Sequence, residues 1–262
     1  MTDVQLPALV VFDLDDTLAP SKSPIDPAMA ALLIRLLEAT QVAVISGGNF
    51  AQFTSQLVAN LPEGAAAHLE RLHLLPTCGT QYYVHRDGGW EQQYAETLTP
   101  AQSTSALAAL EAEARRLGYW EPANPGATVW GPVLEDRGSQ ITFSALGQSA
   151  PVDAKKAWDP TGEKKSALRS AVQELLPELE VRSGGSTSVD ITRRGIDKAY
   201  GMRKLEALTG IPLDDMLFIG DRLDPDGNDY PVLAMGVRCE AVEGWEDTAR
   251  LLEGMLGGVP QG

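Results

Sequence analysis

The stretch Val10–Pro20, VVFDLDDTLAP, begins as an apolar run and then places three aspartates, Asp13, Asp15 and Asp16, within four positions. Carboxylates crowded together repel one another, which raises their pKa values and costs stability unless solvent or a cation compensates. Acidic turns also cap helices, so the stretch alone leaves two interpretations open, a capping turn and a cation site. Other parts of the sequence are needed to choose between a capping turn and a cation site.

The composition is that of an ordinary globular protein. The 262 residues are 44% hydrophobic and 22% charged, and this length allows one large domain or two modest ones. Lys plus Arg number 21 against 36 Asp plus Glu, which gives a formal net charge of −15. Such a charge argues against binding to nucleic acid or to an anionic membrane. An anionic substrate therefore needs a local positive site.

The two cysteines, Cys78 and Cys239, lie far apart and lack metal-binding spacing. We therefore expect reduced thiols rather than a disulfide. The sequence shows neither the pattern of a secretory leader nor an apolar stretch of about 18 residues. These features predict a cytoplasmic protein with no membrane partner.

Short apolar runs alternate with a helical pattern in the first part of the chain. Leu9–Phe12, Val42–Ile45 and the later Met216–Ile219 suit parallel strands that are buried on both faces. Pro27–Ala39 suits a helix with Asp26 as its N-cap, which completes a βαβ unit. A helix over Asn49–Ala59 and a strand over Leu72–Leu75 continue the pattern.

The pattern of apolar and turn-forming residues changes over residues 82–184. YYVHRDGGWEQQY (82–94) predicts an antiparallel hairpin, and Thr99 followed by Pro100 opens an Ala-rich helix. Two further strands, SQITFSAL (139–146) and STSVDIT (186–192), flank a helix over Lys164–Leu176. The predicted fold class is α/β, a doubly wound parallel sheet built from residues 1–81 and 185–262, with an inserted α+β domain over 82–184.

Polar residues follow the carboxyl ends of the predicted strands, where open parallel sheets bind ligands. The first strand is followed by Asp13 and Asp15, the second by Ser46 and Gly47, and the last by Asp221. Converging carboxylates make a hard oxygen site suited to Mg²⁺. An aspartate can attack phosphorus, and a second one two residues on can protonate the leaving oxygen and then activate water.

These motifs together resemble the haloacid dehalogenase superfamily of phosphotransferases. The resemblance rests on the DxDxT pattern of Asp13–Thr17, on Ser46, on Lys198 and on the loop GDRLDPDGND (220–229). The inserted layout is similar to the subclass with a large α+β cap, which includes phosphomannomutases, sucrose-phosphate phosphatases and Cof-type sugar phosphatases. GGSTSVDITRRGIDKAYGMRKL (184–205) is most similar to eukaryotic-type phosphomannomutases.

The resemblance implies a role for each matching residue. Asp13 is the implied nucleophile and Asp15 the acid/base. The implied phosphate-binding residues are Ser46, Gly47 and Lys198. Mg²⁺ is the implied cofactor, held by Asp13, Asp15 (through its backbone carbonyl) and Asp221, with Asn228 and Asp229 supporting that shell. The implied substrate-binding residues of the cap are Arg137, Ser188 and Asp190, although a strand that alternates polar residues equally suits a water-facing surface.

The cap departs from the phosphomannomutase pattern, in which two arginines help to hold the distal phosphate of a sugar bisphosphate. EDRGSQITFSALGQ (135–148) keeps Arg137 but has Gln148 at the second position, and a neutral amide cannot replace a guanidinium on a dianion. We therefore expect first a Mg²⁺-dependent phosphohydrolase acting on a small phosphate monoester, of a sugar, through an aspartyl phosphate.

Two alternatives remain open at this point. One is a phosphomannomutase or phosphoglucomutase that uses a hexose bisphosphate. The other is a noncatalytic sugar-phosphate-binding protein, which the intact pair of Asp13 and Asp15 disfavours because a sensor has no need of the acid/base. In each case the expected partner is a small phosphorylated molecule, and a homodimer is an open possibility.

Overall fold

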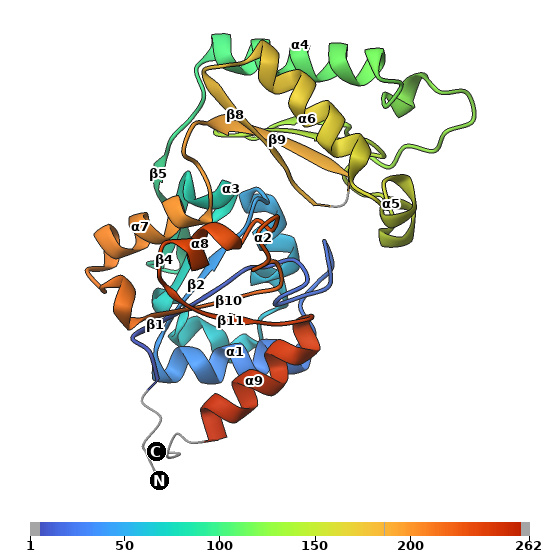
Figure 1. The fold of residues 1–262 in the computed structure, drawn as a ribbon. Coiled ribbons are helices and arrows are strands. Elements are labelled where there is room, and N and C mark those ends of the chain that lie inside the picture. The colour runs from blue at the N-terminus through green and yellow to red at the C-terminus, as the bar shows by residue number, and fades with distance from the viewer. Residues whose placement is uncertain (1–5, 186, 258–262) are drawn as a thin grey trace. The chain divides into compact units, whose positions relative to one another are not determined.

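The computed structural model describes residues 6–185 and 187–257. The chain forms two compact units, whose elements are labelled in Figure 1. The core unit contains Met1–Tyr94 and Asp197–Gly262, and the inserted unit contains Ala95–Ile196. The chain thus leaves the core once and returns to it once, as the sequence predicted for an inserted domain.

A seven-stranded sheet organises the core unit, with the strand order β11-β10-β1-β2-β3-β4-β5. Its strands are β1 (Leu9–Phe12), β2 (Gln41–Ile45), β3 (Leu72–Leu75), β4 (Gln81–Arg86), β5 (Gly89–Ala95), β10 (Met216–Gly220) and β11 (Arg238–Ala241). The pairs from β11 through β3 are parallel, whereas β4 runs antiparallel to β3. The predicted parallel α/β core is therefore present.

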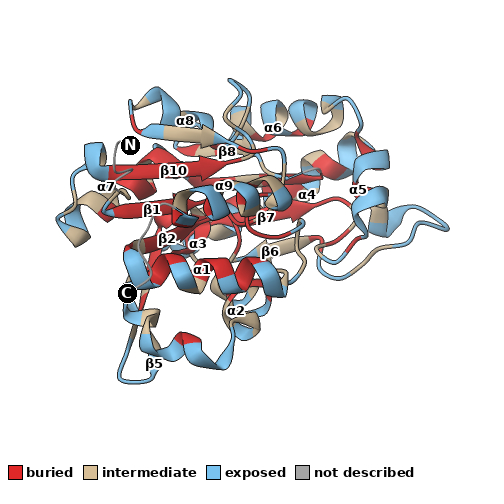
Figure 2. Cartoon of the chain, turned by 90° about the horizontal axis from the view of Figure 1, so that it is seen from below, coloured by how far each residue is buried: buried red, intermediate tan, exposed pale blue. Residues whose placement is uncertain are grey.

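Helices cover both faces of this sheet. The core helices are α1 (Pro27–Ala39), α2 (Phe50–Gln56), α3 (Pro76–Gly79), α7 (Lys198–Thr209), α8 (Tyr230–Ala234) and α9 (Trp245–Gly257), with 3₁₀ turns at Val58–Asn60, Glu63–Ala67, Leu69–Arg71 and Leu213–Asp215. Val10 and Phe12 of β1 pack in one cluster with α1 and α9, while Leu9 and Val11 pack in another with α7 and α8. Every residue of β1 is buried, so its run is continuously apolar (Figure 2).

Two core helices show how far local sequence decides structure. α1 has the predicted bounds, and the Asp26 side chain accepts from the Ala28 N–H at its start. The helix predicted over Asn49–Ala59 is shorter, because α2 ends at Gln56. The Asn60 side chain, at the end of the 3₁₀ turn Val58–Asn60, donates to the carbonyls of Ser55 and Gln56, which satisfies the end of α2.

The segment labelled α3, which follows β3, is a turn rather than a regular helix because it contains consecutive left-handed residues. The φ angles are 50° at Thr77, 56° at Cys78 and 84° at Gly79. The Thr77 N–H donates to the Gly48 carbonyl and the Cys78 N–H to the Ser46 carbonyl, each over 2.9 Å. A Cβ on Gly79 would lie 2.6 Å from the Cα of Gly201 in α7. This strained turn therefore ties the loop after β2 to α7.

The inserted unit is an antiparallel sheet with helices on one face. Its strands are β6 (Leu134–Asp136), β7 (Ile141–Ser144), β8 (Leu179–Ser183) and β9 (Ser188–Arg193), in the order β6-β7-β9-β8, and its helices are α4 (Pro100–Arg116), α5 (Val152–Trp158) and α6 (Glu163–Leu175), with a 3₁₀ turn at Glu121–Ala123. Phe143 and Ile191 of the sheet pack with Leu110 of α4 and Leu168 of α6. The unit therefore has a hydrophobic core of its own.

The two units are divided at other residues than the predicted 82–184. The hairpin β4–β5 belongs to the core because β4 pairs with β3, with Tyr83 opposite Leu74. At the other end β9 pairs with both β7 and β8, so the inserted unit continues to Ile196. Of the predicted strand STSVDIT, Ser186 lies outside the described residues.

Strand β8 lies at an edge of the inserted sheet, and the side chain of Gln173 covers part of that edge. Gln173 Oε1 accepts from the Val181 N–H, and Gln173 Nε2 donates to the Leu179 carbonyl, each over 3.0 Å. A helix side chain from α6 thus makes hydrogen bonds that a neighbouring strand would otherwise make.

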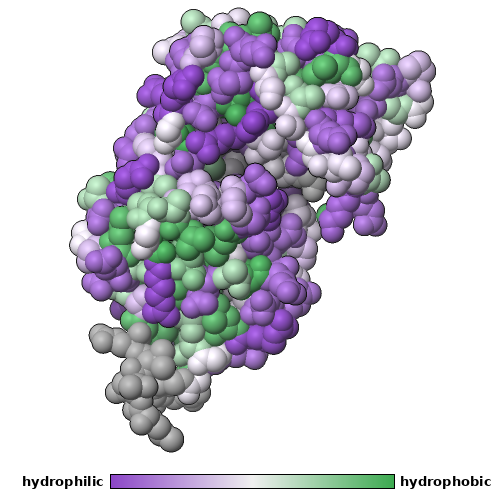
Figure 3. Space-filling model, in the orientation of Figure 1, coloured by the Kyte–Doolittle hydropathy of each residue, from purple (hydrophilic) through white to green (hydrophobic). Residues whose placement is uncertain are grey.

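The surface view shows mixed polar and apolar residues. On the face drawn in Figure 3, hydrophobic side chains gather over the part of the core unit that carries α8, and Leu233 in α8 is 42% exposed. Scattered exposed apolar side chains are normal on soluble domains. Over residues 6–185 and 187–257, none of the helices combines the length and the apolar character needed to cross a membrane.

Candidate active site

The predicted site begins where three neighbouring strands end. Phe12 of β1 lies opposite Val44 of β2 and Ile219 of β10 in parallel register. The residues that follow these strands therefore emerge at one edge of the sheet, among them Asp13, Ser46 and Asp221. The Asp13 N–H donates to the Ile219 carbonyl over 3.0 Å, which fixes the backbone of Asp13 beside β10.

Lys198 lies at the first position of α7, where Asp197 caps the helix by accepting from the Tyr200 N–H. Its Nζ atom lies 2.7 Å from Oδ1 of Asp13 and 2.5 Å from Oδ1 of Asp229. The Lys198 side chain is fully buried. Burial alone would lower the pKa of the Lys198 ammonium, but Asp13 and Asp229 outweigh it and raise that pKa above its usual value. The group is therefore a fixed positive charge.

Three carboxylates lie close together here, and two of them, Asp13 and Asp229, contact this ammonium. One oxygen from each of Asp13, Asp221 and Asp229 lies within 4.8 Å of the others. Burial raises the pKa of Asp13 well above its usual value, against the opposing effect of Lys198. Burial, followed by the charge of Asp229, raises the pKa of Asp221 to about 6. Negative charge thus exceeds positive charge in a desolvated place, which fits a hard divalent cation with oxygen ligands.

Backbone groups and small residues hold Asp221 and Asp229 in position. Asp229 is fully buried, and its Oδ2 accepts from the Arg222 N–H over 3.1 Å. A Cβ on Gly220 would lie 2.4 Å from that same Oδ2, so only glycine leaves room for the carboxylate. Thr17 Oγ1 donates to Asp221 Oδ1 over 3.4 Å, which links the DxDxT motif to the distant loop.

The carboxylate of Asp15 is held by a different set of groups. Its Oδ1 accepts from the Lys22 N–H over 2.7 Å and from Gln56 Nε2 over 3.1 Å. Its Oδ2 accepts from Gln52 Nε2 over 3.1 Å. Both glutamines lie on α2, one helical turn apart. The two aspartates of the motif therefore lie in different environments, Asp13 beside an ammonium and Asp15 beside neutral amides.

Ser46 is the buried polar residue that follows β2. Its Oγ accepts from the Gly48 N–H over 3.2 Å, while its backbone carbonyl accepts from the Cys78 N–H. Gly47, between them, is half-buried. These contacts shape a turn of small residues at the same sheet edge as Asp13, as a phosphate-binding turn requires.

The structure brings some of the predicted core residues together, and their roles stay a prediction. Asp13, Lys198, Asp221 and Asp229 come together, whereas Asn228 is exposed on the loop. Sequence analysis missed Gln52 and Gln56. The available signal was a pair of amides four residues apart on the helix that follows the Ser46 turn, a spacing that places both on one helix face.

The predicted substrate residues of the inserted unit already have partners. The Arg137 guanidinium lies 2.8 Å from Glu135, and its side chain is almost fully buried. Ser188 Oγ lies 3.2 Å from Ser144 Oγ on the neighbouring strand. Asp190 Oδ1 accepts from Thr142 Oγ1 over 2.7 Å. Their roles toward a substrate stay a prediction.

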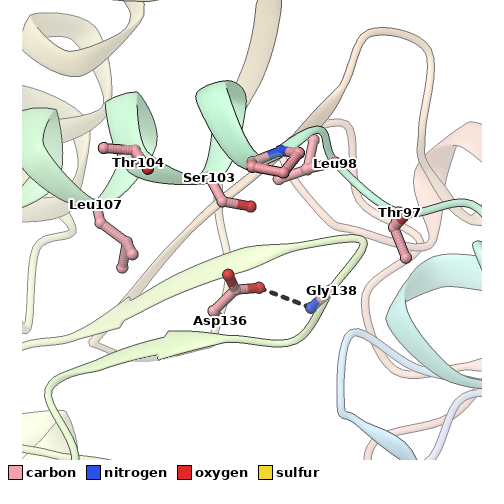
Figure 4. A pocket seen from close by; sticks show the side chains of 8 residues that line it. Thr97, Leu98, Ser103, Thr104, Leu107, Asp136 and Gly138 are labelled. Atoms are coloured by element: carbon pink, nitrogen blue, oxygen red, sulfur yellow. Dashed lines mark hydrogen bonds between the residues drawn. The ribbon is translucent and has the colours of Figure 1, made fainter.

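The inserted unit also contains an open pocket of about 390 Å³ beside the start of α4 (Figure 4). It is lined by Thr97, Leu98, Pro100, Ser103, Thr104, Leu107, Asp136 and Gly138. Its charged lining residue, Asp136, accepts from the Gly138 N–H over 2.8 Å. An acidic pocket without a lining cation does not suit a phosphate ester, so we do not assign the predicted site to it.

Comparisons with known proteins agree with the motifs. The family model described as eukaryotic phosphomannomutase matches residues 128–257. A probable phosphomannomutase of Caenorhabditis elegans is 27% identical over 259 residues, covering 95% of this chain and 95% of the relative. Phosphomannomutase 1 of Homo sapiens is 24% identical over 240 residues, covering 86% of this chain and 83% of the relative.

A solved structure with the same fold has a different description. A haloacid dehalogenase-like hydrolase from Bacteroides thetaiotaomicron superimposes with a TM-score of 0.62 at 16% identity, covering 95% of this chain and 99% of that one. At this identity the similarity establishes the fold. The sequence relatives therefore have mutase names, and a structural neighbour has a hydrolase description.

Proposed function

Because the chain is a member of the haloacid dehalogenase superfamily close to the phosphomannomutases, we propose that it moves a phosphoryl group of a hexose phosphate through an aspartyl phosphate on Asp13. Its relatives make it an enzyme of phosphoryl transfer, a phosphomutase or a phosphatase. The observation that carries the proposal is the buried Asp13 carboxylate 2.7 Å from Lys198 and beside two further carboxylates.

The first half of the reaction transfers the phosphoryl group to the protein. An oxygen of Asp13 attacks phosphorus and forms a new O–P bond, while the bond between phosphorus and the ester oxygen breaks. Asp15 donates a proton to the leaving oxygen. Lys198, the Ser46 hydroxyl and the backbone around Gly47 bind the phosphoryl oxygens, on which negative charge must be stabilised.

The second half reverses these roles. Asp15 takes a proton from the acceptor hydroxyl, whose oxygen attacks phosphorus, and the bond to Asp13 breaks. When the acceptor is a second hydroxyl of the sugar phosphate, the reaction is a mutase reaction; when it is water, the reaction is hydrolysis. Asp13, Asp221 and the Asp15 backbone carbonyl would hold Mg²⁺, which supplies charge neutralisation between nucleophile and phosphate when bound.

We rank the mutase first, which reverses the order expected from the sequence. The relatives named phosphomannomutase match this chain over nearly its whole length. The expectation of a phosphohydrolase, by contrast, depended on residues of the inserted unit alone. Hydrolysis remains the second candidate because Arg137 is already paired with Glu135 and position 148 is a glutamine. Residues 135–148 therefore offer few cationic side chains for holding the second phosphate of a bisphosphate.

Phosphorus NMR on the purified protein separates the two candidates. Mannose 1-phosphate or glucose 1-phosphate is added with Mg²⁺ and a catalytic amount of hexose 1,6-bisphosphate. We expect 6-phosphate to accumulate faster than inorganic phosphate, and the opposite order would establish hydrolysis as the main reaction. Asp13→Asn is the control, and consumption of the ester at the unmodified rate by this variant would overturn both candidates.

A further inference from the structure

The carboxylate of Asp15 is bound on both oxygens by side chains of one helix, a feature that the proposed reaction does not by itself require. Gln52 Nε2 donates to Oδ2 and Gln56 Nε2 donates to Oδ1, each over 3.1 Å. These contacts span 37 and 41 residues of sequence. A general acid must lie within hydrogen-bond reach of the leaving oxygen, so its orientation decides how well it works.

The Gln56 amide is fixed in the orientation that donates to Asp15. Its residue is 2% exposed, and the same Nε2 also donates to the Ser23 carbonyl over 3.0 Å. A flipped amide would turn Oε1 toward two acceptors. Among the described residues, Gln56 Oε1 has no hydrogen-bond partner. A buried carbonyl oxygen without a partner costs stability, so this arrangement is better explained by the binding of Asp15 than by packing.

In its contact with Asp15, the Gln52 side chain occupies the space that a side chain on residue 48 would need. A Cβ on Gly48 would lie 2.6 Å from Gln52 Oε1 and 2.7 Å from its Cδ. Gly48 has no need of glycine for a left-handed backbone, because its φ lies outside that region. The space that it leaves is occupied by the Gln52 side chain. The glycine of the turn after β2 therefore admits the second amide that binds the acid/base.

From these contacts we propose that Gln52 and Gln56 are positioning residues that orient the Asp15 carboxylate for proton transfer, an inference that rests on the proposed function. Among the described residues, the side chains of these glutamines donate to Asp15 and to the Ser23 carbonyl, and neither donates to Asp13 or Asp221. Their effect on the reaction is therefore exerted through Asp15. Loss of either amide lowers the rate of those steps in which the leaving oxygen needs a proton.

The test varies how much the leaving oxygen needs that proton. The nitrophenolate that leaves p-nitrophenyl phosphate is weakly basic and departs without an acid, whereas the sugar oxygen of glucose 1-phosphate is strongly basic. The experiment measures kcat/KM for both esters in the full-length protein with Mg²⁺. The variants are Gln52→Met and Gln56→Met, which keep side-chain length but remove the donor.

We expect kcat/KM for glucose 1-phosphate to fall about 10- to 100-fold in each variant, as is typical when a hydrogen-bond partner of an active-site group is lost. We expect kcat/KM for p-nitrophenyl phosphate to change less than about threefold. Melting temperatures should stay within about 4 °C of the unmodified protein. Ser55→Ala, an exposed change on the same helix, should match the unmodified protein with both esters.

Two results would overturn the inference while leaving the proposed function intact. Either both esters lose activity to the same extent in both variants, which indicates a general structural role, or neither ester is affected. If the unmodified protein consumes neither ester, or Asp13→Asn consumes both at the unmodified rate, the proposed function fails and this inference fails with it.

Discussion

Asp13 is costly to the folded protein, because its buried carboxylate lies close to two others and only one ammonium contacts it. We predict that Asp13→Asn reduces turnover by at least about a thousandfold, since an amide does not attack phosphorus. The same change removes a negative charge from a repelling group, so the free energy of unfolding without Mg²⁺ should not decrease. Phosphate-ester consumption and urea unfolding of both proteins measure the two effects. Retained turnover in a folded variant would exclude Asp13 as nucleophile.

A second prediction for a single residue concerns His73, which is not part of the group of Asp13, Asp221 and Asp229. It is buried in β3, with Nδ1 2.7 Å from the Tyr82 hydroxyl and Nε2 2.8 Å from Gln41 Oε1. Burial lowers the pKa of His73 to about 4 from an ordinary 6.5. The unfolded chain therefore binds this proton more readily between these pH values, so the contribution of His73 to stability is complete above pH 6.5 and is lost as the pH falls toward 4.

At pH 4.5 the contribution of His73 to the free energy of unfolding should be roughly 2–3 kcal/mol smaller than at pH 7, because each pH unit between the two pKa values changes it by about 1.36 kcal/mol. Urea unfolding of the protein and of His73→Gln at pH 7 and pH 4.5 isolates it, because the carboxylates that titrate in the same range are common to both chains. The variant should lose less stability between the two pH values than the unmodified protein. Equal losses would contradict a neutral, buried His73.

At the scale of elements, the left-handed turn Thr77–Gly79 offers a test of packing against conformation. Gly79 has a φ of +84° and no room for a Cβ against Gly201 of α7, while Gly88 in the β4–β5 hairpin has a φ of +81° with nothing within 4 Å. Gly88→Ala should therefore cost only the backbone strain of about 1 kcal/mol. Gly79→Ala should cost about 3 kcal/mol or more, because the backbone of α7 must also shift.

Thermal or urea unfolding of the two glycine variants measures this difference directly. Since α7 begins at Lys198, the Gly79 variant should also lose phosphate-ester turnover, whereas the Gly88 variant should retain it. If the two variants have equal stability, the close approach of the turn to α7 is not a constraint on the fold.

The elements also show what sequence could and could not predict. α1 was predictable because Asp26, Pro27 and the leucines that follow are local signals. The hairpin β4–β5 was recognised, but its place in the core sheet was not, because the pairing of Tyr83 with Leu74 is a tertiary contact. The meeting of Asp13 and Asp221 was predictable from their places at the ends of parallel strands, whereas Lys198 was expected only from the family resemblance. The contact of Gln52 with Asp15 was not predictable, since the Gln52 side chain occupies the space beside Gly48, which is a tertiary feature.

For the molecule as a whole, the acidic group formed by Asp13, Asp221 and Asp229 predicts that Mg²⁺ stabilises the fold. A ligand that binds only the native state raises the free energy of unfolding by RT ln(1 + [L]/Kd). We expect the melting temperature to rise with Mg²⁺ and the rise to be much smaller in Asp221→Asn. With a formal charge of −15, the protein also responds to ionic strength, so sodium chloride at equal ionic strength is the control.

Activity provides the second measurement of the cation. EDTA should remove turnover, Mg²⁺ should restore it, and Ca²⁺ should not, because its larger and looser coordination misplaces the oxygens that it binds. Full turnover in the chelator, or an equal rise in melting temperature with Na⁺ and with Mg²⁺, would exclude the acidic group as a cation site.

The side chain of Gln173 is relevant to self-association of this protein. An edge strand whose N–H and C=O groups are open is a template for a strand from a second molecule, and such strand addition leads to aggregation. At β8 the amide of Gln173 already occupies the Val181 N–H and the Leu179 carbonyl. Gln173→Leu would expose both groups, and sedimentation velocity at rising concentration should then show larger species than the unmodified protein forms. We therefore expect one glutamine to limit self-association through strand addition, which the net charge of the chain does not block at that edge.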